Sequence, residues 1–271
     1  MPELPEVETT RRGIAPHLIG QQITGLTIRD HRLRWPVRRD LGREMLGNTI
    51  HAVDRRAKYL LLRMDNGTLI LHLGMSGSLR IVPAGSAPRK HDHFDLTLAN
   101  NQVLRFHDPR RFGAILWTRR DPYRHPCLAD LGPEPLGPEF TGEYLYQRSR
   151  GRKQAIKSLI MDGRVVVGVG NIYACEALFK AGIHPRIAAG RISRSRYVRL
   201  VTAIQTVLQE AIQQGGTTLR DFTQSNGEPG YFALSLNVYG REGKPCTSCG
   251  RPIRQITIGQ RSSFYCAHCQ H

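Results

Sequence analysis

Short apolar segments separated by turn residues dominate the first half of the chain. Each has the length and the Ile, Leu, Val or Phe content of a β-strand, and they cover residues 23–28, 59–64, 68–73, 78–82, 94–98, 103–106 and 114–118. Asp65-Asn66-Gly67, between two of these segments, is typical of a hairpin turn. Short strands at this spacing predict an antiparallel sandwich or barrel. A helix is expected before them, because Pro5 suits a first turn and Val7, Ile14 and Leu18 offer an apolar face.

The apolar period becomes helical after residues 132–138, which contain three Pro and two Gly and are therefore predicted to be an interdomain linker. Helices are expected at residues 154–161, 171–181, 196–214 and 218–222. The third is the clearest, because apolar residues follow one side of it, namely Leu200, Ile204, Val207, Leu208, Ala211 and Ile212. Gly215-Gly216 ends this helix, and from residue 236 the pattern returns to short strands and turns.

The charge of the chain points to a polyanionic partner. Its 271 residues include 39 Lys and Arg against 22 Asp and Glu, a net charge of +17. Arg makes up 33 of the 39 cations, and Arg binds phosphate bidentately. The excess is +7 up to Arg150 (23 basic, 16 acidic) and +10 beyond it (16 basic, 6 acidic), so two basic regions are expected rather than one basic tail. A solvated Arg-rich surface is the alternative explanation.

Composition also excludes several classes of protein. With 40% hydrophobic and 23% charged residues, the chain is expected to be globular rather than disordered. No apolar run approaches the roughly 20 residues that span a bilayer. The first ten residues carry Glu3, Glu6 and Glu8 and lack the apolar stretch of a signal peptide, so a cytoplasmic location is expected.

Cysteine spacing predicts a metal site. Cys246 and Cys249 form one C-x2-C pair, and Cys266 and Cys269 form a second after a 16-residue spacer. Four thiolates so arranged typically bind one zinc ion, and a closed four-Cys site is structural rather than catalytic. Two disulfides are the weaker alternative, because no secretion signal is present and two Cys would remain unpaired.

The zinc hairpin is expected to carry Arg251, Arg254 and Arg261, which suits phosphate contact, although a solvated ribbon or a protein-binding ribbon is an alternative. Cys127 and Cys175, the remaining cysteines, are interpreted as buried thiols.

Pro2 follows the initiator Met, and removal of Met1 would expose a secondary amine. An α-amino group titrates near 7.7–8.0, so part of it is neutral and nucleophilic at neutral pH. Attack on a sugar C1′ would give an iminium ion, with Glu3 and Glu6 available to move protons. From these residues alone, acidic side chains at a helix start have the simpler explanation of favouring the helix dipole.

Several motifs occur in a fixed order along the chain. They are residues 2–9 (PELPEVET), 55–60 (RRAKYL), 72–77 (HLGMSG), 90–93 (KHDH), 108–113 (DPRRFG), 168–173 (GVGNIY) and the cysteine hairpin with Gln260-Arg261. Together they resemble the bacterial formamidopyrimidine-DNA glycosylases, which are 8-oxoguanine DNA glycosylase/AP lyases, over essentially the whole chain. Leu4 favours this branch, because the sister group acting on oxidised pyrimidines typically begins PEGPE.

The resemblance implies an α+β multidomain fold: a β-sandwich with an N-terminal helix (1–131), a linker (132–139), a helix–two-turn–helix domain (140–235) and a zinc finger hairpin (236–271). It implies a monomer that binds double-stranded DNA at the bacterial nucleoid and flips the damaged nucleotide out of the stack. The implied reaction is excision of oxidised purines, chiefly 8-oxoguanine opposite cytosine and formamidopyrimidines, through a Schiff base on Pro2, followed by β,δ-elimination at the abasic site.

The resemblance also assigns roles to single residues. The implied catalytic residues are Pro2 (nucleophile), Glu3 (general acid), Glu6 (proton movement), Lys58 (near the lesion and its phosphate) and Arg261 (phosphate clamp). The implied DNA-binding residues are Met75, Arg110 and Phe112, which enter the duplex, together with Asn171 of the clamp, His91 and Arg152. Lys157 is a further candidate, and residues 217–231 match a loop that closes over the base.

Other interpretations of these residues stay open. Composition alone would place Met75 and Phe112 in a core, and Lys58 could be a solvated charge. His91 and His93 alternate and could share a metal, but no third ligand is near in sequence. Cys175 and Asn226 depart from the family pattern. A glycosylase for oxidised pyrimidines and a non-enzymatic zinc-ribbon protein are the rival functions; the second leaves the Pro-Glu terminus unexplained.

Overall fold

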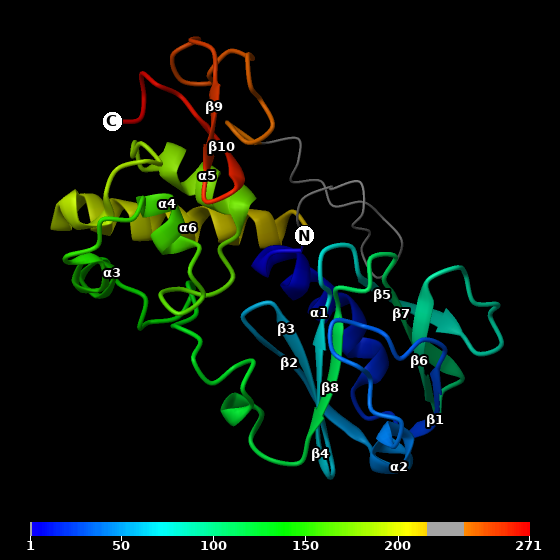
Figure 1. The fold of residues 1–271 in the computed structure, drawn as a ribbon. Coiled ribbons are helices and arrows are strands. Elements are labelled where there is room, and N and C mark those ends of the chain that lie inside the picture. Colours follow the sequence, from blue (N-terminus) through cyan, green and yellow to red (C-terminus); the bar gives the residue numbers. More distant parts are fainter. Residues whose placement is uncertain (1, 216–235) are drawn as a thin grey trace. The chain divides into compact units, whose positions relative to one another are not determined.

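Two four-stranded antiparallel sheets form the first part of the chain in this computed structural model, which describes residues 2–215 and 236–271 (Figure 1). One sheet has the order β1-β6-β7-β5 and the other β2-β3-β4-β8. Their bounds are β1 (Ile23–Ile28), β2 (Ile50–Arg56), β3 (Tyr59–Met64), β4 (Gly67–His72), β5 (Ser78–Pro83), β6 (Asp92–Leu98), β7 (Gln102–His107) and β8 (Ala114–Thr118). The predicted antiparallel sandwich is confirmed.

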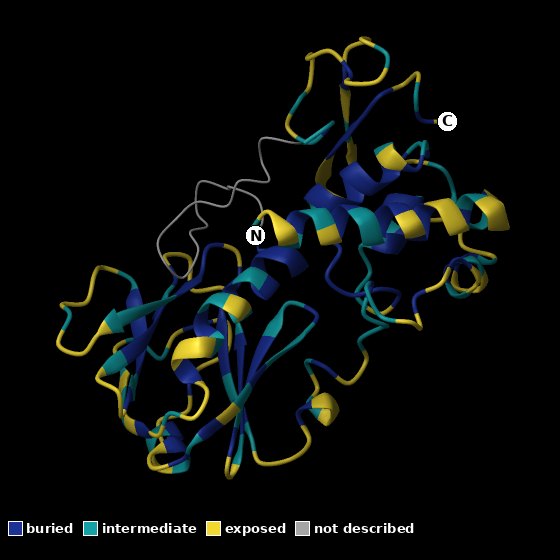
Figure 2. Ribbon diagram, turned by 180° about the vertical axis from the view of Figure 1, so that it is seen from behind, coloured by how far each residue is buried: buried dark blue, intermediate teal, exposed yellow. Residues whose placement is uncertain are grey.

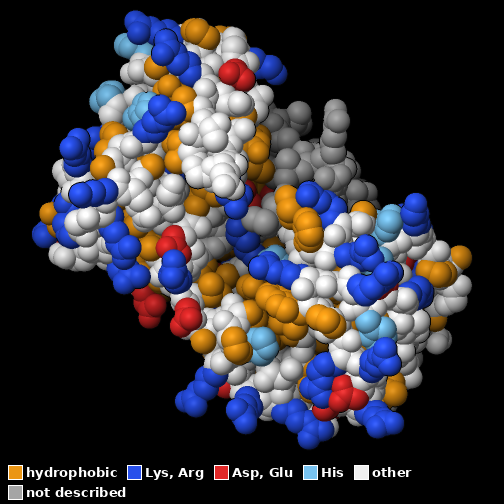
Figure 3. Space-filling model, in the orientation of Figure 1, with side chains coloured by type: hydrophobic (Ala, Val, Ile, Leu, Met, Phe, Trp, Pro, Cys, Tyr) orange, Lys and Arg blue, Asp and Glu red, His pale blue; other side chains and the backbone are white. Residues whose placement is uncertain are grey.

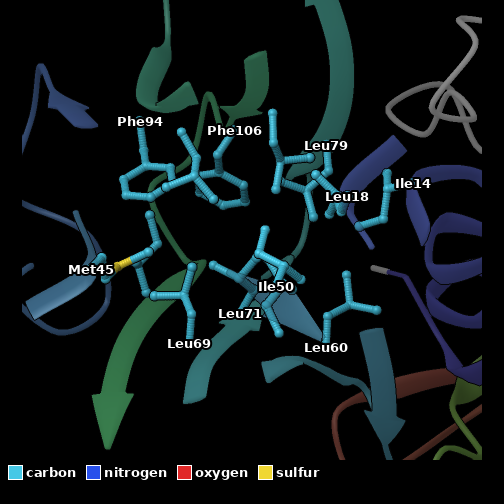
Figure 4. Close-up of a cluster of buried hydrophobic side chains, with 14 of the residues drawn as sticks. Ile14, Leu18, Met45, Ile50, Leu60, Leu69, Leu71, Leu79, Phe94 and Phe106 are labelled. Atoms are coloured by element: carbon cyan, nitrogen blue, oxygen red, sulfur yellow. The ribbon is translucent and has the colours of Figure 1, made fainter. Parts of the chain in front are cut away.

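The core of the sandwich lies between the two sheets. Leu60, Leu69 and Leu71 of one sheet and Phe94 and Phe106 of the other belong to one cluster of buried side chains (Figure 4). The N-terminal helix α1 (Leu4–Leu18) contacts β2, β3 and β5, so it packs on strands of both sheets. Its apolar face is the predicted one, since Val7, Ile14 and Leu18 are all buried in this core. Burial of such side chains contributes about 1.5–3 kcal/mol each.

The strand boundaries follow the sequence pattern within two residues, but β2 was not predicted. Its sequence, IHAVDRR, buries only Ile50 and Val53 and carries charges at its end, so it lacks a continuous apolar run. As the edge strand of its sheet it pairs with β3 alone. The predicted hairpin is present: Met64 pairs with Gly67, which leaves Asp65 and Asn66 as the two turn residues.

The second part of the chain, residues 130–213 and 236–271 among those described, is a separate compact unit of helices and a hairpin. Its helices are α3 (Gly142–Ser149), α4 (Ile156–Ile160), α5 (Asn171–Lys180) and α6 (Arg194–Gln213). Helix α5 is mostly buried, whereas α6 buries one side and exposes the other (Figure 2). The predicted α5 and α6 are confirmed to within two residues, and the helix expected at 218–222 lies outside the described residues.

Helix α3 was not predicted, because its segment GEYLYQRS contains few apolar residues. Thr141 begins it by accepting the backbone N–H of Tyr144, which is an ordinary N-cap. Leu145 is fully buried, and the helix packs against α6. Short 3₁₀ turns occur at Pro122–Arg124 in the first unit and at Ala189–Arg191 in the second.

The C-terminal hairpin pairs β9 (Arg254–Ile258) with β10 (Arg261–Tyr265). Its small core consists of Val238, Ile253 and Phe264 packed around Cys246 and Cys266, and Cys175 of α5 joins this cluster. Across the described residues, no helix is both long and apolar enough to cross a membrane.

Candidate functional site

The residue that precedes α1 is Glu3, and it caps the helix together with Glu6. Glu6 Oε2 accepts the backbone N–H of Glu3 at 2.8 Å, and the Glu3 carboxylate accepts the backbone N–H of Glu6 in return. This reciprocal capping box fixes the peptide that follows Pro2. Pro2, Glu3 and Glu6 are all buried. The carboxylates therefore have the capping role that the helix start suggested, and they hold the backbone directly after Pro2.

Glu8, on the next turn of α1, connects the helix to the turn that holds Lys58. It accepts hydrogen bonds from Arg11, Arg12 and Arg55. Burial alone would raise the pKa of Glu8, but the hydrogen bonds from Arg11 and Arg12 and the nearby charges lower that pKa to about 2. Arg55 also donates from Nη1 to the carbonyl of Ala57 at 2.9 Å. The chain of contacts thus runs from α1 to the tip of the β2–β3 hairpin.

Lys58 occupies that tip, which is a two-residue turn because Arg56 pairs with Tyr59. Ala57 adopts a left-handed conformation with φ of 54°, which allows the chain to reverse direction within two residues. Lys58 is partly exposed. The site therefore keeps an ammonium group near the surface at the end of a rigid hairpin.

His72 on β4 pairs with Tyr59 on β3, and no role for it was predicted from the sequence. The two rings are 4.7 Å apart between centroids. Burial lowers the pKa of His72 to about 4, and the positive charges of Lys58 and Arg34 act in the same direction. Its Nδ1 accepts the N–H of Gly74 at 3.0 Å, so the neutral ring keeps Nε2–H as a donor. Its position as the first residue of the motif at residues 72–77 is the sequence feature that could have identified it.

Met75 and Phe112, for which composition alone favoured a core position, are exposed on loops. Met75 is 36% exposed and Phe112 45%. Arg110 is also exposed, and its guanidinium lies 5.1 Å from the centre of the Phe112 ring. Two apolar side chains and a stacked cation at the surface are suited to enter a gap in a base stack.

The alternating histidines do not form a metal site. His93 is buried, and its Nε2 hydrogen-bonds to the carbonyl oxygen of Asp108 at 2.8 Å. The His91 ring lies 6.1 Å from the rings of both His93 and His107, and His91 has a φ of 73°. Of all His, Cys, Asp and Glu side chains in the described part of the chain, only the four C-terminal cysteines cluster as metal ligands do. Hydrogen bonding is thus the observed use of His93.

In the second unit, Asn171 is the first residue of α5, with Gly170 before it as the cap. Lys157 of α4 donates from Nζ to Asn171 Oδ1 at 2.6 Å. The same ammonium group donates to the carbonyl of Ser262 at 3.0 Å and to Ser263 Oγ at 2.6 Å. Lys157 is only 1% exposed, so its expected direct contact with DNA is wrong; it joins the start of α5 to β10 instead.

Arg261 is exposed at the start of β10, where Gly259 and Gln260 form the left-handed turn of the hairpin. A hollow of about 290 Å³ lies beside it, lined by Lys157, Ser158, Met161, Asp162, Ile258, Gly259 and Arg261. Asn171 stands at the N-terminus of α5, the end of a helix that favours anions. Asn171 on α5 and Arg261 on β10 thus belong to one unit, and Lys157 connects these two elements.

Arg152 is exposed and belongs to a larger basic hollow of the second unit, with a volume of about 740 Å³. Its charged lining residues are Arg152, Lys153, Arg186 and Arg191. Figure 3 shows that Lys and Arg side chains spread over the visible surface of both units, with scattered Asp and Glu among them. The excess positive charge is therefore a surface property of each unit and suits a polyanion.

The four C-terminal cysteines fit one structural zinc ion. Their Sγ atoms all lie within 4.8 Å of one another, with Cys246 and Cys269 3.9 Å apart and Cys249 and Cys266 3.5 Å apart. A tetrahedron with zinc–sulfur bonds of about 2.3 Å needs sulfur atoms about 3.8 Å apart. All four ligand positions would be filled by protein, so the ion stabilises the hairpin that carries Arg261 and takes no part in chemistry.

The two other cysteines differ from each other. Cys175 is buried, as expected. Cys127 is only half-buried, which corrects the expectation for that residue, because it lies in a surface loop after β8, with its Sγ 3.0 Å from His125 Nδ1. Burial raises the pKa of the Cys127 thiol to about 11, so it is not a thiolate at neutral pH.

Comparison with known protein families matches three successive segments of the chain. Residues 1–115 match the formamidopyrimidine-DNA glycosylase N-terminal domain, and residues 131–223 match the formamidopyrimidine-DNA glycosylase H2TH domain. Residues 243–271 match the zinc finger found in FPG and IleRS.

Individual proteins are similar over the full length. Formamidopyrimidine-DNA glycosylases from Syntrophotalea carbinolica and Stutzerimonas stutzeri are each 60% identical over 270 residues and 100% of both chains. The MutM (FPG) crystal structure from Thermus thermophilus superposes with a TM-score of 0.88 at 40% identity, covering 99% of this chain and 98% of that one. A Lactococcus lactis FPG mutant complexed with Fapy-dG DNA gives 0.92 at 33% identity, with 99% of both chains covered.

Proposed function

The chain belongs to the formamidopyrimidine-DNA glycosylase family, whose enzymes repair oxidised purines in DNA, and we propose that it is a bifunctional glycosylase and abasic-site lyase. Its substrates are 8-oxoguanine opposite cytosine and formamidopyrimidines in double-stranded DNA. The observation that carries this proposal is the pair of buried carboxylates, Glu3 and Glu6, fixed beside Pro2. Complexes of a similar Lactococcus lactis protein contain DNA with Fapy-dG or with an abasic site, which supports both halves of the reaction.

The first chemical step is attack by the Pro2 amine after Met1 is removed. The amine lone pair bonds to C1′ of the flipped nucleotide, the bond from C1′ to the base breaks, and the base leaves with a proton. Glu3 then protonates the ring oxygen O4′, the sugar opens, and the secondary amine and C1′ become an iminium ion. Glu6, which accepts the N–H of Glu3, keeps the reacting peptide in place and assists the proton transfers.

The second step is strand cleavage driven by the iminium ion, which acidifies the neighbouring C–H bond. Loss of the C2′ proton expels the 3′ phosphate, and loss of the C4′ proton then expels the 5′ phosphate. Water hydrolyses the remaining imine and returns the Pro2 amine. The result of these β- and δ-eliminations is a one-nucleotide gap with phosphate at both ends.

The remaining site residues hold the DNA. Met75, Arg110 and Phe112 fill the space left by the flipped nucleotide, where filling offsets an unstacking cost of a few kcal/mol. Lys58 and the His72 Nε2–H contact the lesion and its phosphate. Asn171 and Arg261 clamp the phosphates around it, while His91 and Arg152 contact the backbone further away. The zinc ion keeps the hairpin of Arg261 folded.

We extend the proposal to organisation and location. The chain is a monomer with a catalytic domain at residues 1–131, a linker at 132–139, a helix–two-turn–helix domain at 140–235 and a zinc finger at 236–271. It acts in the bacterial cytoplasm at the nucleoid. The loop proposed to close over the base, residues 217–231, and Asn226 within it lie outside the described residues.

The test is single-turnover excision on matched duplexes that carry 8-oxoguanine, a formamidopyrimidine or thymine glycol. We expect the two purine lesions to be excised faster, with products that end in phosphate on both sides of the gap. Faster excision of thymine glycol would favour the rival pyrimidine glycosylase. Tight DNA binding with no excision of any lesion would favour a non-enzymatic zinc-ribbon protein.

A further inference from the structure

Asp108, directly after β7, is fully buried although it is flanked by the exposed loop of Arg110 and Phe112. Its Oδ1 accepts hydrogen bonds from Ser76 Oγ at 3.1 Å and from the backbone N–H of Arg110 at 3.2 Å. Its Oδ2 accepts the backbone N–H of Gly113 at 2.8 Å. One carboxylate thus holds the loop that carries Met75 and both ends of the loop that carries Arg110 and Phe112.

The backbone of Asp108 is fixed to the neighbouring segment. Its N–H donates to the carbonyl of His91 at 3.0 Å, and its own carbonyl oxygen lies 2.8 Å from Nε2 of the buried His93. The backbone of Asp108 is therefore anchored to the segment at β6, while its carboxylate binds the two loops. A buried, fully hydrogen-bonded group of this kind specifies one arrangement of its partners.

The two loops also touch through their backbones. Gly74 has a φ of 65°, and a Cβ placed on it would lie 2.5 Å from both the Phe112 carbonyl carbon and the Gly113 nitrogen. A Cβ on Gly113 would lie 2.8 Å from the carbonyl oxygen of His72. Such distances leave no room for a side chain at either glycine, so the backbones of the two loops are in direct contact here.

We propose that Asp108 is a positioning residue that joins residues 73–77 and 108–113 into one insertion unit, so that Met75, Arg110 and Phe112 enter the duplex at fixed mutual positions. The inference rests on the proposed function, in which these three side chains fill the gap. Two separately mobile loops would have to become ordered each time the protein binds DNA, whereas two joined loops already hold their side chains in the bound arrangement. A displacement of about 1 Å in such an arrangement costs about 100-fold in rate.

The test compares two substrates with the full-length, zinc-loaded protein. One is a duplex with 8-oxoguanine opposite cytosine, and the other is a single strand with an abasic site, which has no orphaned base and no gap to fill. Asp108→Asn keeps the shape of the side chain but retains only one accepting oxygen, so it releases at least one loop contact. Ser76→Ala releases the Met75 loop alone, and Ser86→Ala on an exposed turn is the control.

For D108N we expect duplex excision to fall about 10- to 100-fold, while cleavage of the single-stranded abasic site changes less than about twofold. The preference for cytosine over adenine opposite the lesion should also weaken, because Arg110 is less well placed. S76A should reduce duplex excision by a smaller factor, and S86A should match the wild type.

Equal losses on both substrates in D108N would overturn the proposal, since Asp108 would then support the reaction centre or the fold as a whole. Unchanged duplex excision by folded D108N would also overturn it. If D108N fails to fold, an unchanged duplex rate in S76A overturns it instead. A wild-type protein that cleaves neither substrate would contradict the proposed function itself, which separates the two failures.

Discussion

Lys157 Nζ lies 2.6 Å from Asn171 Oδ1, and this hydrogen bond joins α4 to the first residue of α5. The same ammonium group reaches Ser262 and Ser263 on β10, and Asn171 Nδ2 also donates to the Ser262 carbonyl. The proposed clamp residues Asn171 and Arg261 thus depend on a buried lysine that itself is not available to DNA.

Replacing Lys157 by Met should therefore damage both stability and binding. The Asn171 amide oxygen and the Ser263 hydroxyl would lose their donor inside the protein, and each such loss costs about 1–3 kcal/mol. We expect the free energy of unfolding to fall by about 3 kcal/mol and DNA affinity to fall with it, as measured by thermal denaturation and fluorescence anisotropy. Lys153→Met, on the exposed lining of the basic hollow, is the control and should leave stability unchanged. A wild-type melting temperature for K157M would contradict this account.

Removing zinc should abolish DNA binding, although the ion takes no part in the proposed reaction. The hairpin has a core of only a few side chains, so it depends on the metal to stay folded. Metal analysis should give one zinc per chain in the wild type, none in Cys246→Ser, and one in the control Cys127→Ser. Binding should follow zinc content in all three. Tight DNA binding by protein from which a chelator has removed the zinc would show that the folded hairpin is not needed for binding.

Arg261→Ala should separate the clamp from the zinc site. Loss of one phosphate contact is expected to weaken DNA binding by about 1–2 kcal/mol and to reduce the slope of log affinity against log salt by about 1. Zinc content should stay at one ion per chain. Arg254→Ala removes the same charge from β9 of the same hairpin and should weaken binding less. Equal loss of zinc and affinity in R261A would mean that Arg261 supports the hairpin instead.

The stability of the protein should decrease between pH 6.5 and 4 because of His72. Its pKa is about 4 in the folded protein, against 6.5 for the free side chain. Below pH 6.5 His72 is protonated in the unfolded chain but stays neutral in the folded protein. The contribution of neutral His72 to the free energy of unfolding is therefore present above pH 6.5 and is lost as the pH falls toward 4. The loss is at most about 3 kcal/mol.

His72→Asn keeps a polar side chain but does not titrate, so its melting temperature should fall less than that of the wild type over this range. Denaturation scans at half-unit steps of pH would show the difference. Parallel curves for the two proteins would indicate that His72 does not govern this range.

Much of the fold could be predicted because the local pattern of apolar residues agrees with the secondary structure that these segments adopt. Strands β3, β4 and β8 contain runs of consecutive apolar residues, and α6 repeats its apolar residues with the helical period. The cysteine cluster could be predicted from spacing, because tetrahedral ligation allows few arrangements. Strand β2 and helix α3 were missed because tertiary contacts, rather than their own sequence pattern, place them.

The buried polar residues of the site could not be predicted in the same way. Asp108 meets Ser76 across 32 positions of sequence, and Lys157 meets Ser263 across 106. No local pattern distinguishes such residues from solvated ones. His72 differs again, since its neutral state depends on burial and on the charge of Lys58, and both arise only from folding.

Borohydride reduction tests the central claim most directly, because it converts an iminium ion between enzyme and DNA into a stable amine. The wild-type protein should be incubated with a duplex containing 8-oxoguanine opposite cytosine, reduced, digested and analysed by mass spectrometry of the cross-linked peptide. We predict one adduct, on the nitrogen of Pro2, which is strongly reduced in Pro2→Gly and absent when Met1 is retained. An adduct on a lysine side chain such as Lys58, or no adduct at all, would contradict the account.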